Sequence, residues 1–148
     1  MSHHITIRRK VEFSETDMAG IVHFSNYFRY VEIAEAALFE AAGYPLIQRT
    51  RDLAEGWPRV RASCDFRQPL YFGNECEVYL EVVELKIKAI EFKFRIHRLD
   101  PESDPVLVAK GKMTTVYARL LGGGHAMESK TLPPDLTKKI APPGQPDV

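Results

Sequence analysis

The chain has 148 residues, of which 45% are hydrophobic and 27% charged, and its 20 basic residues balance its 20 acidic residues. These values are those of one ordinary folded domain, large enough to bury a core without help from a metal or disulfides. A net charge of zero argues against a nucleic-acid partner, and no apolar run reaches the about 20 residues of a membrane span.

The first predicted elements are a strand and a polar loop. Apolar and polar side chains alternate over residues 5–13, which is the period of a strand with one buried face. The polar stretch 14–20 breaks this pattern and contains a glycine, so it indicates a loop. A helix is expected to follow, with Ser25 or Asn26 as its cap.

The helix is predicted to be long and largely buried. From residue 27 to residue 42 the apolar side chains gather on one face and leave a narrow polar stripe at Arg29, Glu32 and Glu40. Gly43 is typical of the position just past a helix C-terminus, so we place the end of the helix there.

Alternation of apolar and polar residues returns in four later segments. It covers residues 60–66, 76–82, 90–96 and 106–118 and predicts four more strands, whereas 46–57 has no clear period and is expected to form a short helix or turn. Together these elements predict an α+β domain in which an antiparallel sheet of about five strands covers one buried helix. The other face of such a sheet needs a cover, and self-association is the expected one.

The end of the chain is predicted to differ from this domain. Gly122 to Gly124 indicate a flexible turn, and half of the ten prolines lie beyond residue 131. We therefore expect a single domain over residues 1–140 and a disordered, proline-rich tail over 141–148.

The two cysteines, Cys64 and Cys76, are too few for a disulfide framework and have no metal-ligand spacing. The simplest interpretation is a cytoplasmic protein with reduced thiols and no bound metal. Cys64 falls on the apolar phase of its strand, which favours a core position over a role as nucleophile.

An acidic residue near the helix start is the first candidate for chemistry. Asp17 precedes the helix by a few residues, and the free backbone N–H groups of a helix N-terminus bind a developing oxyanion on a carbonyl that the carboxylate also reaches. An ordinary loop aspartate in an Asx turn is the commoner alternative. His23 is either a general base or a histidine that only packs and hydrogen-bonds at the loop–helix junction.

The segment around Asp17 resembles a known active-site signature. Residues 16–27, Thr-Asp-Met-Ala-Gly-Ile-Val-His-Phe-Ser-Asn-Tyr, closely resemble that of the 4-hydroxybenzoyl-CoA thioesterase family of hot-dog proteins. The wider similarity runs from about residue 6 to residue 136 and includes 65–75. It implies a hot-dog fold, and dimers with active sites at the subunit interface that pair into homotetramers. It also implies hydrolysis of acyl-CoA thioesters without a metal or other cofactor.

Carried over by position, the resemblance assigns roles to residues of the signature. Asp17 is the catalytic carboxylate, acting as nucleophile or as general base toward water, and the backbone N–H of Phe24 polarises the thioester carbonyl. Gly20 lets the loop pass close to the substrate. Asn26 and Tyr27 anchor the helix start.

The resemblance places four further residues at the substrate. Glu32 is expected to face the acyl group, and Lys86 and Lys88 to meet the CoA phosphates. His23 stands next to the oxyanion position, where many relatives carry an aromatic residue. Ordinary solvated lysines at a strand end are the alternative for Lys86 and Lys88.

The favoured function is hydrolysis of a small aromatic or short-chain acyl-CoA to the free acid and CoA. The alternative is a non-catalytic hot-dog module that binds an acyl-CoA or another protein, and Asp17 discriminates, because a binding module needs no carboxylate beside the thioester. A hot-dog dehydratase ranks third, because such enzymes use a histidine with an acidic partner from the central helix and residues 27–42 contain no histidine. No nucleic-acid or membrane partner is expected.

Overall fold

The structure is a computed structural model that describes residues 2–49, 53–121 and 127–145. Its elements follow in the order β1 (His4–Lys10), a 3-10 turn (Phe13–Glu15), α1 (Ser25–Ala41), β2 (Gln48–Arg49), β3 (Leu53–Gly56), β4 (Arg59–Phe66), β5 (Glu75–Leu85), β6 (Ala89–Leu99), β7 (Val106–Val116), β8 (Ala118–Leu121), β9 (Met127–Ser129) and α2 (Pro134–Ile140). No helix of these described ranges is long and apolar enough to cross a membrane.

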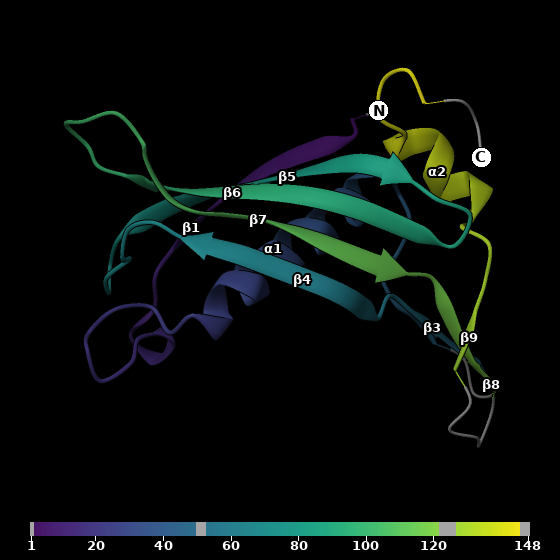
Figure 1. Cartoon of the computed structure of the whole chain (residues 1–148), viewed down its shortest axis with the longest axis horizontal. Helices are drawn as coiled ribbons and strands as arrows, with labels where there is room; N and C mark the ends of the chain where they lie inside the picture. Colours follow the sequence, from purple (N-terminus) through teal and green to yellow (C-terminus); the bar gives the residue numbers. More distant parts are fainter. Residues whose placement is uncertain (1, 50–52, 122–126, 146–148) are drawn as a thin grey trace.

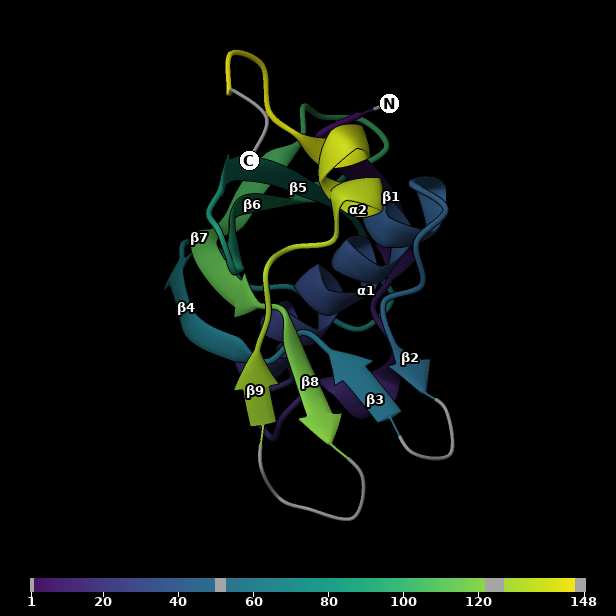
Figure 2. The ribbon, with the colours of Figure 1, turned by 90° about the vertical axis from the view of Figure 1, so that its right-hand side faces the viewer.

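A five-stranded antiparallel sheet in the order β1-β5-β6-β7-β4 forms one layer of the molecule, and α1 forms the other. The sheet lies in front of α1 in Figure 1, and Figure 2 shows α1 nearly end-on within the curve of the sheet. A smaller sheet in the order β2-β3-β8-β9 lies at one end. This architecture confirms the predicted α+β fold with one helix under a five-stranded sheet.

The core fills the space between α1 and the concave face of the large sheet. Leu80 and Val82 of β5 are paired in register with Phe94 and Phe92 of β6, and all four side chains are at most 1% exposed. They meet α1 through residues such as Tyr30, which is also fully buried. Burial of side chains of this size stabilises the fold by roughly 1.5–3 kcal/mol each.

The helix begins at Ser25, one residue earlier than a cap at Ser25 predicts, and the residue at its cap position, Phe24, provides no side-chain cap. The N–H of Ser25 donates to His23 Nδ1 at 3.3 Å, and the N–H of Asn26 donates to the His23 carbonyl at 2.9 Å. His23 therefore satisfies the first helical N–H groups in place of Ser25 or Asn26. At the other end Gly43 has φ of +71°, the left-handed conformation expected of the residue that terminates a helix.

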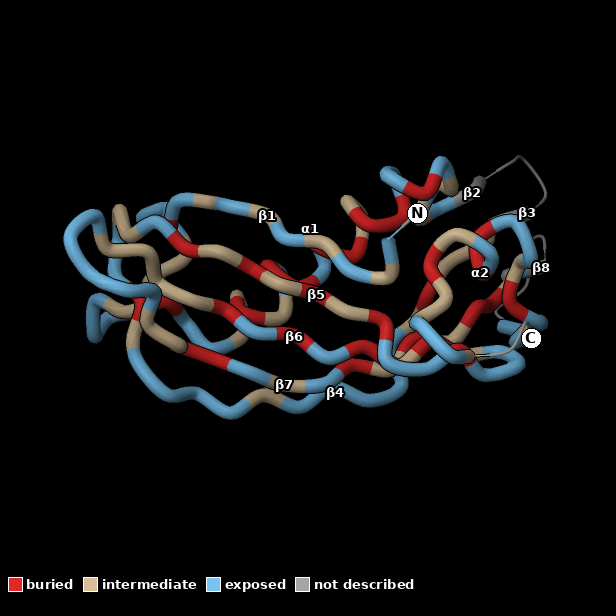
Figure 3. Tube along the Cα trace, turned by 90° about the horizontal axis from the view of Figure 1, so that it is seen from above, coloured by how far each residue is buried: buried red, intermediate tan, exposed pale blue. Residues whose placement is uncertain are grey.

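The outer face of the large sheet is polar, so the expectation of an uncovered apolar face is wrong. Along β5 and β6, buried residues alternate with charged ones such as Glu77, Glu81, Lys93 and Arg95, which point away from α1. Figure 3 shows this alternation of buried and accessible positions along both strands. Strict alternation on central strands leaves the second face to water, so this face needs no apolar cover.

Two other expectations differ from the structure for reasons of tertiary context. The stretch 46–57 forms the short strands β2 and β3, because pairing with β8 supplies the backbone partners that local sequence does not indicate. The apolar residues of β4 are not buried in the chain: Val60 is 63% and Phe66 49% exposed. The reason is that β4 is an edge strand of the sheet.

The described part of the chain continues for five residues past α2. In this segment, residues 141–145, Gln145 Oε1 accepts a hydrogen bond from the Leu85 N–H at 2.9 Å. The disorder expected over residues 141–148 stays a prediction. Residues 146–148 and the expected turn at Gly122 to Gly124 lie outside the described residues.

One carboxylate is buried inside the core. Glu35 of α1 is 0% exposed, and its Oε1 accepts a hydrogen bond from Arg59 Nη2 at 2.9 Å, while its Oε2 has no partner among the described residues. Arg59 begins β4, donates from Nη1 to the Trp57 carbonyl at 2.7 Å, and lies 3.5 Å from the exposed Glu32 carboxylate. The buried pair therefore fastens the edge strand to the central helix.

Glu35 makes the stability of the protein depend on pH. Burial raises the pKa of Glu35 from 4.5 to about 7, despite the opposing charge of Arg59. When the pKa of a carboxyl group is higher in the folded than in the unfolded protein, its protonated form stabilises the fold. This contribution to the free energy of unfolding is fully present below the unfolded-state pKa of 4.5 and is lost as the pH rises through about 7.

We expect Glu35→Gln to become more stable relative to the wild type as the pH rises. The difference in free energy of unfolding should change by up to about 3 kcal/mol between about pH 4 and pH 8, because the amide does not ionise. Urea denaturation of both proteins across this range measures the difference. A difference that is the same at every pH would contradict the prediction.

Candidate active site

A cleft of about 600 Å³ lies at the end of the molecule where the loop before α1 meets the segment after β4, on the left in Figure 1. It brings together two parts of the chain about fifty residues apart. Its lining residues are Asp17, Ile21, Val22, Phe24, Tyr27, Phe66, Arg67, Gln68, Pro69 and Tyr71. Three of the residues named from the sequence, Asp17, Phe24 and Tyr27, therefore line one cavity.

The Asp17 carboxylate is presented by a tight turn. Its Oδ1 accepts a hydrogen bond from the Ala19 N–H at 2.8 Å, and its backbone carbonyl accepts one from the Gly20 N–H at 3.0 Å. Gly20 has φ of +83°, which only glycine adopts without strain. Asp17 therefore forms an Asx turn, as an ordinary loop aspartate does. Its carboxylate is also exposed on the wall of the cleft.

Glu15 holds the Asp17 loop against the helix, a role that the sequence analysis missed. Its carboxylate accepts hydrogen bonds from Arg9 Nη2 at 2.7 Å and from the Tyr30 hydroxyl at 3.0 Å. Its backbone carbonyl accepts from the His23 N–H at 2.9 Å and from Asn26 Nδ2 at 2.8 Å. Asn26 therefore anchors the helix start, as expected, and the acceptor that it uses is Glu15.

One N–H at the start of α1, that of the cleft-lining residue Phe24, has no hydrogen-bond partner among the described residues. The N–H groups of Ser25, Asn26 and Tyr27 are hydrogen-bonded to His23 Nδ1, the His23 carbonyl and the Phe24 carbonyl. No hydrogen bond among the described residues uses the N–H of Phe24, the residue immediately before the helix. A free N–H at the positive end of a helix dipole is suited to bind a negatively charged oxygen.

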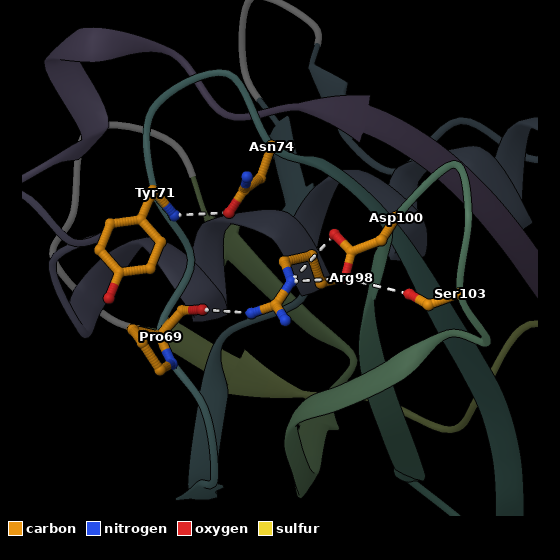
Figure 4. A network of polar contacts seen from close by, with 6 residues as sticks. All are labelled: Pro69, Tyr71, Asn74, Arg98, Asp100 and Ser103. Carbon is orange, nitrogen blue, oxygen red and sulfur yellow. Dashed lines mark hydrogen bonds and ion pairs between the residues drawn. The ribbon is translucent and has the colours of Figure 1, made fainter.

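The opposite wall of the cleft is tied both to the Asp17 loop and to β6. The Val22 N–H donates to the Leu70 carbonyl at 2.8 Å, and Ile21 forms a β-bridge with Tyr71. In Figure 4, Arg98 of β6 donates from Nη1 to the Pro69 carbonyl at 3.3 Å. The two walls therefore form one hydrogen-bonded unit.

Three further contacts in Figure 4 shape this wall. The Tyr71 N–H donates to Asn74 Oδ1 at 2.8 Å, which closes the turn that follows Tyr71. Arg98 also contacts both oxygens of Asp100 through Nε at 3.2 Å, and the Ser103 hydroxyl donates to the same carboxylate at 3.5 Å. Arg98 is thereby oriented toward Pro69.

Four aromatic residues, Phe24, Tyr27, Phe66 and Tyr71, are among those that line the cleft. Phe66 meets the ring of Tyr27 edge-on, with centroids 5.2 Å apart, and that of Phe24 at 6.5 Å. Phe24 is 61% and Tyr71 48% exposed, so both present ring surface to solvent. The His23 imidazole stacks on Phe24 and hydrogen-bonds the Ser25 hydroxyl at 2.8 Å, outside the lining of the cleft.

The structure does not bring Glu32, Lys86 or Lys88 to the cleft of their own chain. Glu32 is exposed on α1, where it pairs with Arg59. Lys86 pairs with Glu91 at 2.7 Å and, like Lys88, lies in the β5–β6 turn. The whole length of β5, about 35 Å for an 11-residue strand, separates this turn from the cleft end of the sheet.

Neither cysteine thiol is in its reactive form at neutral pH. Burial raises the pKa of both the Cys64 and Cys76 thiols to about 11, so neither is a thiolate at neutral pH. Within the described ranges, no group of three or more His, Cys, Asp or Glu side chains is arranged to hold a metal ion. Asp17 is the one acidic side chain among the described residues that line the cleft, which also include Arg67, Gln68 and Tyr71.

Comparisons with known proteins point in the same direction. The 1,4-dihydroxy-2-naphthoyl-CoA hydrolase of Rippkaea orientalis is 34% identical over 104 residues, which cover 70% of this chain and 74% of that protein. The 4-hydroxybenzoyl-CoA thioesterase of Pseudomonas sp. strain CBS-3 is 26% identical over 138 residues, 91% of this chain and 96% of that one. A solved structure of the Pseudomonas enzyme shares the fold, with a TM-score of 0.78 at 23% identity over 91% of this chain and 97% of that one.

The family model of the Thioesterase-like superfamily matches residues 11–140. This segment includes the Asp17 loop, α1 and four of the five strands of the large sheet, all but β1. The matched segment contains every residue that lines the cleft. The chain belongs to the Thioesterase-like superfamily and has its hot-dog fold.

Proposed function

We propose that the protein is an acyl-CoA thioesterase that hydrolyses a small aromatic or short-chain acyl-CoA in the Asp17 cleft. The observation that carries the proposal is the pairing, in one cavity, of an exposed carboxylate with the free N–H of Phe24 at the start of α1. Both groups act on the same reacting carbonyl in an acyl transfer.

The reaction needs only these two groups and water. The Phe24 N–H donates to the thioester oxygen and stabilises the negative charge that grows there. Asp17 either attacks the carbonyl carbon, which releases CoA thiolate and leaves an anhydride for water to hydrolyse, or removes a proton from the attacking water. The products are the free acid and CoA on both routes, and neither route uses a metal or other cofactor.

The lining of the cleft supports an aromatic acyl group. The rings of Phe24, Phe66 and Tyr71 offer apolar faces and edges against which an aromatic acyl chain stacks. The names of two relatives, 1,4-dihydroxy-2-naphthoyl-CoA hydrolase and 4-hydroxybenzoyl-CoA thioesterase, specify aromatic thioesters. We therefore rank aromatic substrates ahead of short-chain ones.

The remaining residues of the signature serve this geometry in the proposal. Gly20 keeps the loop close to the thioester, while Asn26 and Tyr27 fix the helix start that presents the oxyanion donor. His23 contributes next to that donor by holding the first N–H groups of α1.

Self-association through β4 completes the proposed site. The outward side of β4 is an unpaired strand edge with exposed Val60 and Phe66, which favours pairing with another strand. Antiparallel pairing of two β4 strands places the Arg59 end of one copy beside the Phe66 end, and hence the cleft, of the other. Glu32, which pairs with Arg59, then lies next to the acyl group of the second copy.

The same pairing gives Lys86 and Lys88 a role in a neighbouring subunit, where they meet the CoA phosphates. This pairing makes a dimer, and a dimer of dimers, as a homotetramer, is the further assembly that the resemblance to the 4-hydroxybenzoyl-CoA thioesterase family implies. We place the enzyme in the cytoplasm, which suits its two free cysteines.

A hydrolysis screen tests the proposed function. Purified protein is incubated with 4-hydroxybenzoyl-CoA, 1,4-dihydroxy-2-naphthoyl-CoA, butyryl-CoA and palmitoyl-CoA, and released thiol is measured with and without EDTA. We expect an aromatic substrate to reach a kcat/KM of about 10⁴ M⁻¹s⁻¹ or more, unaffected by EDTA. Binding without thiol release from any substrate would favour the non-catalytic acyl-CoA-binding module instead.

A further inference from the structure

A second hollow lies on the outer face of the large sheet, on the side turned away from α1. It has a volume of about 480 Å³ and is lined by side chains and backbone of β4, β6 and β7, the three neighbouring strands toward the viewer in Figure 1. Its lining residues are Ser63, Cys64, Asp65, Lys93, Phe94, Arg95, Lys110, Gly111 and Lys112. It shares no residue with the Asp17 cleft.

Four cations surround this hollow in two directly opposed pairs. Lys93 of β6 is the register partner of Lys112 of β7, and Arg95 is the partner of Lys110. All four residues are exposed, and one carboxylate, Asp65, lines the same hollow. Opposed residues in an antiparallel sheet lie about 5 Å apart, and alternate residues of one strand about 7 Å apart, so the four charges occupy a small area.

Two of these cations form no ion pair within the part of the chain that the structure describes, although Asp65 of β4 is the register partner of one of them, Lys110. Lys93 pairs with Glu81 at 3.3 Å, and the Arg95 guanidinium lies over the Tyr79 ring at 5.0 Å. No ion pair among the described residues includes Lys110 or Lys112. Like charges placed directly opposite each other destabilise a sheet, so the chain, whose net charge is zero, concentrates positive charge here at a cost.

From this geometry we propose that the hollow is a binding site for an oligophosphate group. A chain of two or three linked phosphates carries several negative charges within a few ångströms, which matches four cations on adjacent strands. Arg95 offers a planar fork for bidentate contact with one phosphate, and the lysines act as point charges on the others. Ser63 adds a hydroxyl donor at the edge of the site.

The oligophosphate has two possible sources, CoA and a separate effector such as a nucleoside triphosphate. In the first case the hollow, in place of Lys86 and Lys88, holds the diphosphate end of the substrate, and the inference rests on the proposed function. In the second it is a site that is independent of catalysis. The binding measurement below is made without thioester chemistry, so its result stands apart from that of the hydrolysis screen.

Isothermal titration of the full chain with inorganic triphosphate at low ionic strength tests the proposal. We expect saturable binding that weakens as salt is added, because the contact is electrostatic. Lys110→Gln/Lys112→Gln should weaken binding at least tenfold, since it removes the two unpaired cations. The matched control is Lys130→Gln/Lys138→Gln, which removes the same charge elsewhere and should change binding less than twofold.

Competition then separates the two sources. If CoA displaces triphosphate and Lys110→Gln/Lys112→Gln raises KM for acyl-CoA, the ligand is the substrate. If CoA does not compete and KM is unchanged, the ligand is a separate oligophosphate. Both results support the site.

Three results would overturn the proposal. The first is no saturable binding of triphosphate to the wild type, and the second is equal loss of binding in the control variant. The third is a wild type that binds no triphosphate and forms an oligomer, where sedimentation shows that Lys110→Gln/Lys112→Gln dissociates this oligomer. The face would then be an interface between copies of the chain.

Discussion

Asp17→Asn is expected to lower kcat on the best acyl-CoA by about a thousandfold or more, with little change in KM. The amide keeps the size of the side chain and its Oδ1, which accepts the hydrogen bond from the Ala19 N–H, so the loop keeps its turn. It removes the negative charge that both catalytic routes require. A thousandfold loss corresponds to about 4 kcal/mol of transition-state stabilisation.

The control for this variant is Asp104→Asn, the same change at an exposed position between β6 and β7. It should leave kcat within about twofold of the wild type, because surface substitutions remote from a site have small effects. Circular dichroism and thermal melting show whether both variants fold. A folded Asp17→Asn protein with wild-type turnover would remove Asp17 from the mechanism.

Gly111→Ala is expected to destabilise the fold strongly, and much more than the same change at Gly56. A Cβ at Gly111 would overlap the Ser63 carbonyl oxygen and lie 2.7 Å from Cζ of the buried Phe94 ring. The first neighbour is the backbone of β4, which is paired with β7 through Cys64 and Gly111, so relief requires the two strands to separate. We expect a loss of about 3 kcal/mol and a fall in Tm of about 10 °C.

Gly56→Ala provides the matched control for this effect. Gly56 also lies in a strand, β3, but a Cβ there meets nothing within 4 Å. Its Tm should stay within about 2 °C of the wild type. Equal melting temperatures for the two variants would contradict the prediction, because β4 would then move away from residue 111 without loss of stability.

The sequence was sufficient to predict the layers of the fold because each central strand has one buried face. In β5 and β6 every second residue is apolar over most of the strand, and these apolar residues are the buried ones in the structure. The prediction failed for Val60 and Phe66, which follow the same pattern but lie on an edge strand. Position within a sheet is a tertiary property that alternation does not encode.

The candidate site was predictable only where it is local in sequence. Asp17 and Phe24 are seven residues apart, so a loop leading into a helix brings them to one place. Phe66 and Arg67, on the opposite wall, come from a distant strand end, and no local pattern indicates that approach. Glu15 was missed because it acts through hydrogen bonds to Tyr30 and to the backbone around α1, which leave no periodic signal.

A crystal structure of Asp17→Asn protein with the best acyl-CoA from the screen tests the central claim most directly, because the substrate is held without turnover. We expect the thioester oxygen to accept a hydrogen bond of about 2.9 Å from the Phe24 N–H, with the thioester carbon about 3–3.5 Å from the side chain at position 17. A thioester bound outside the Asp17 cleft, or one whose oxygen does not contact Phe24, would contradict the account.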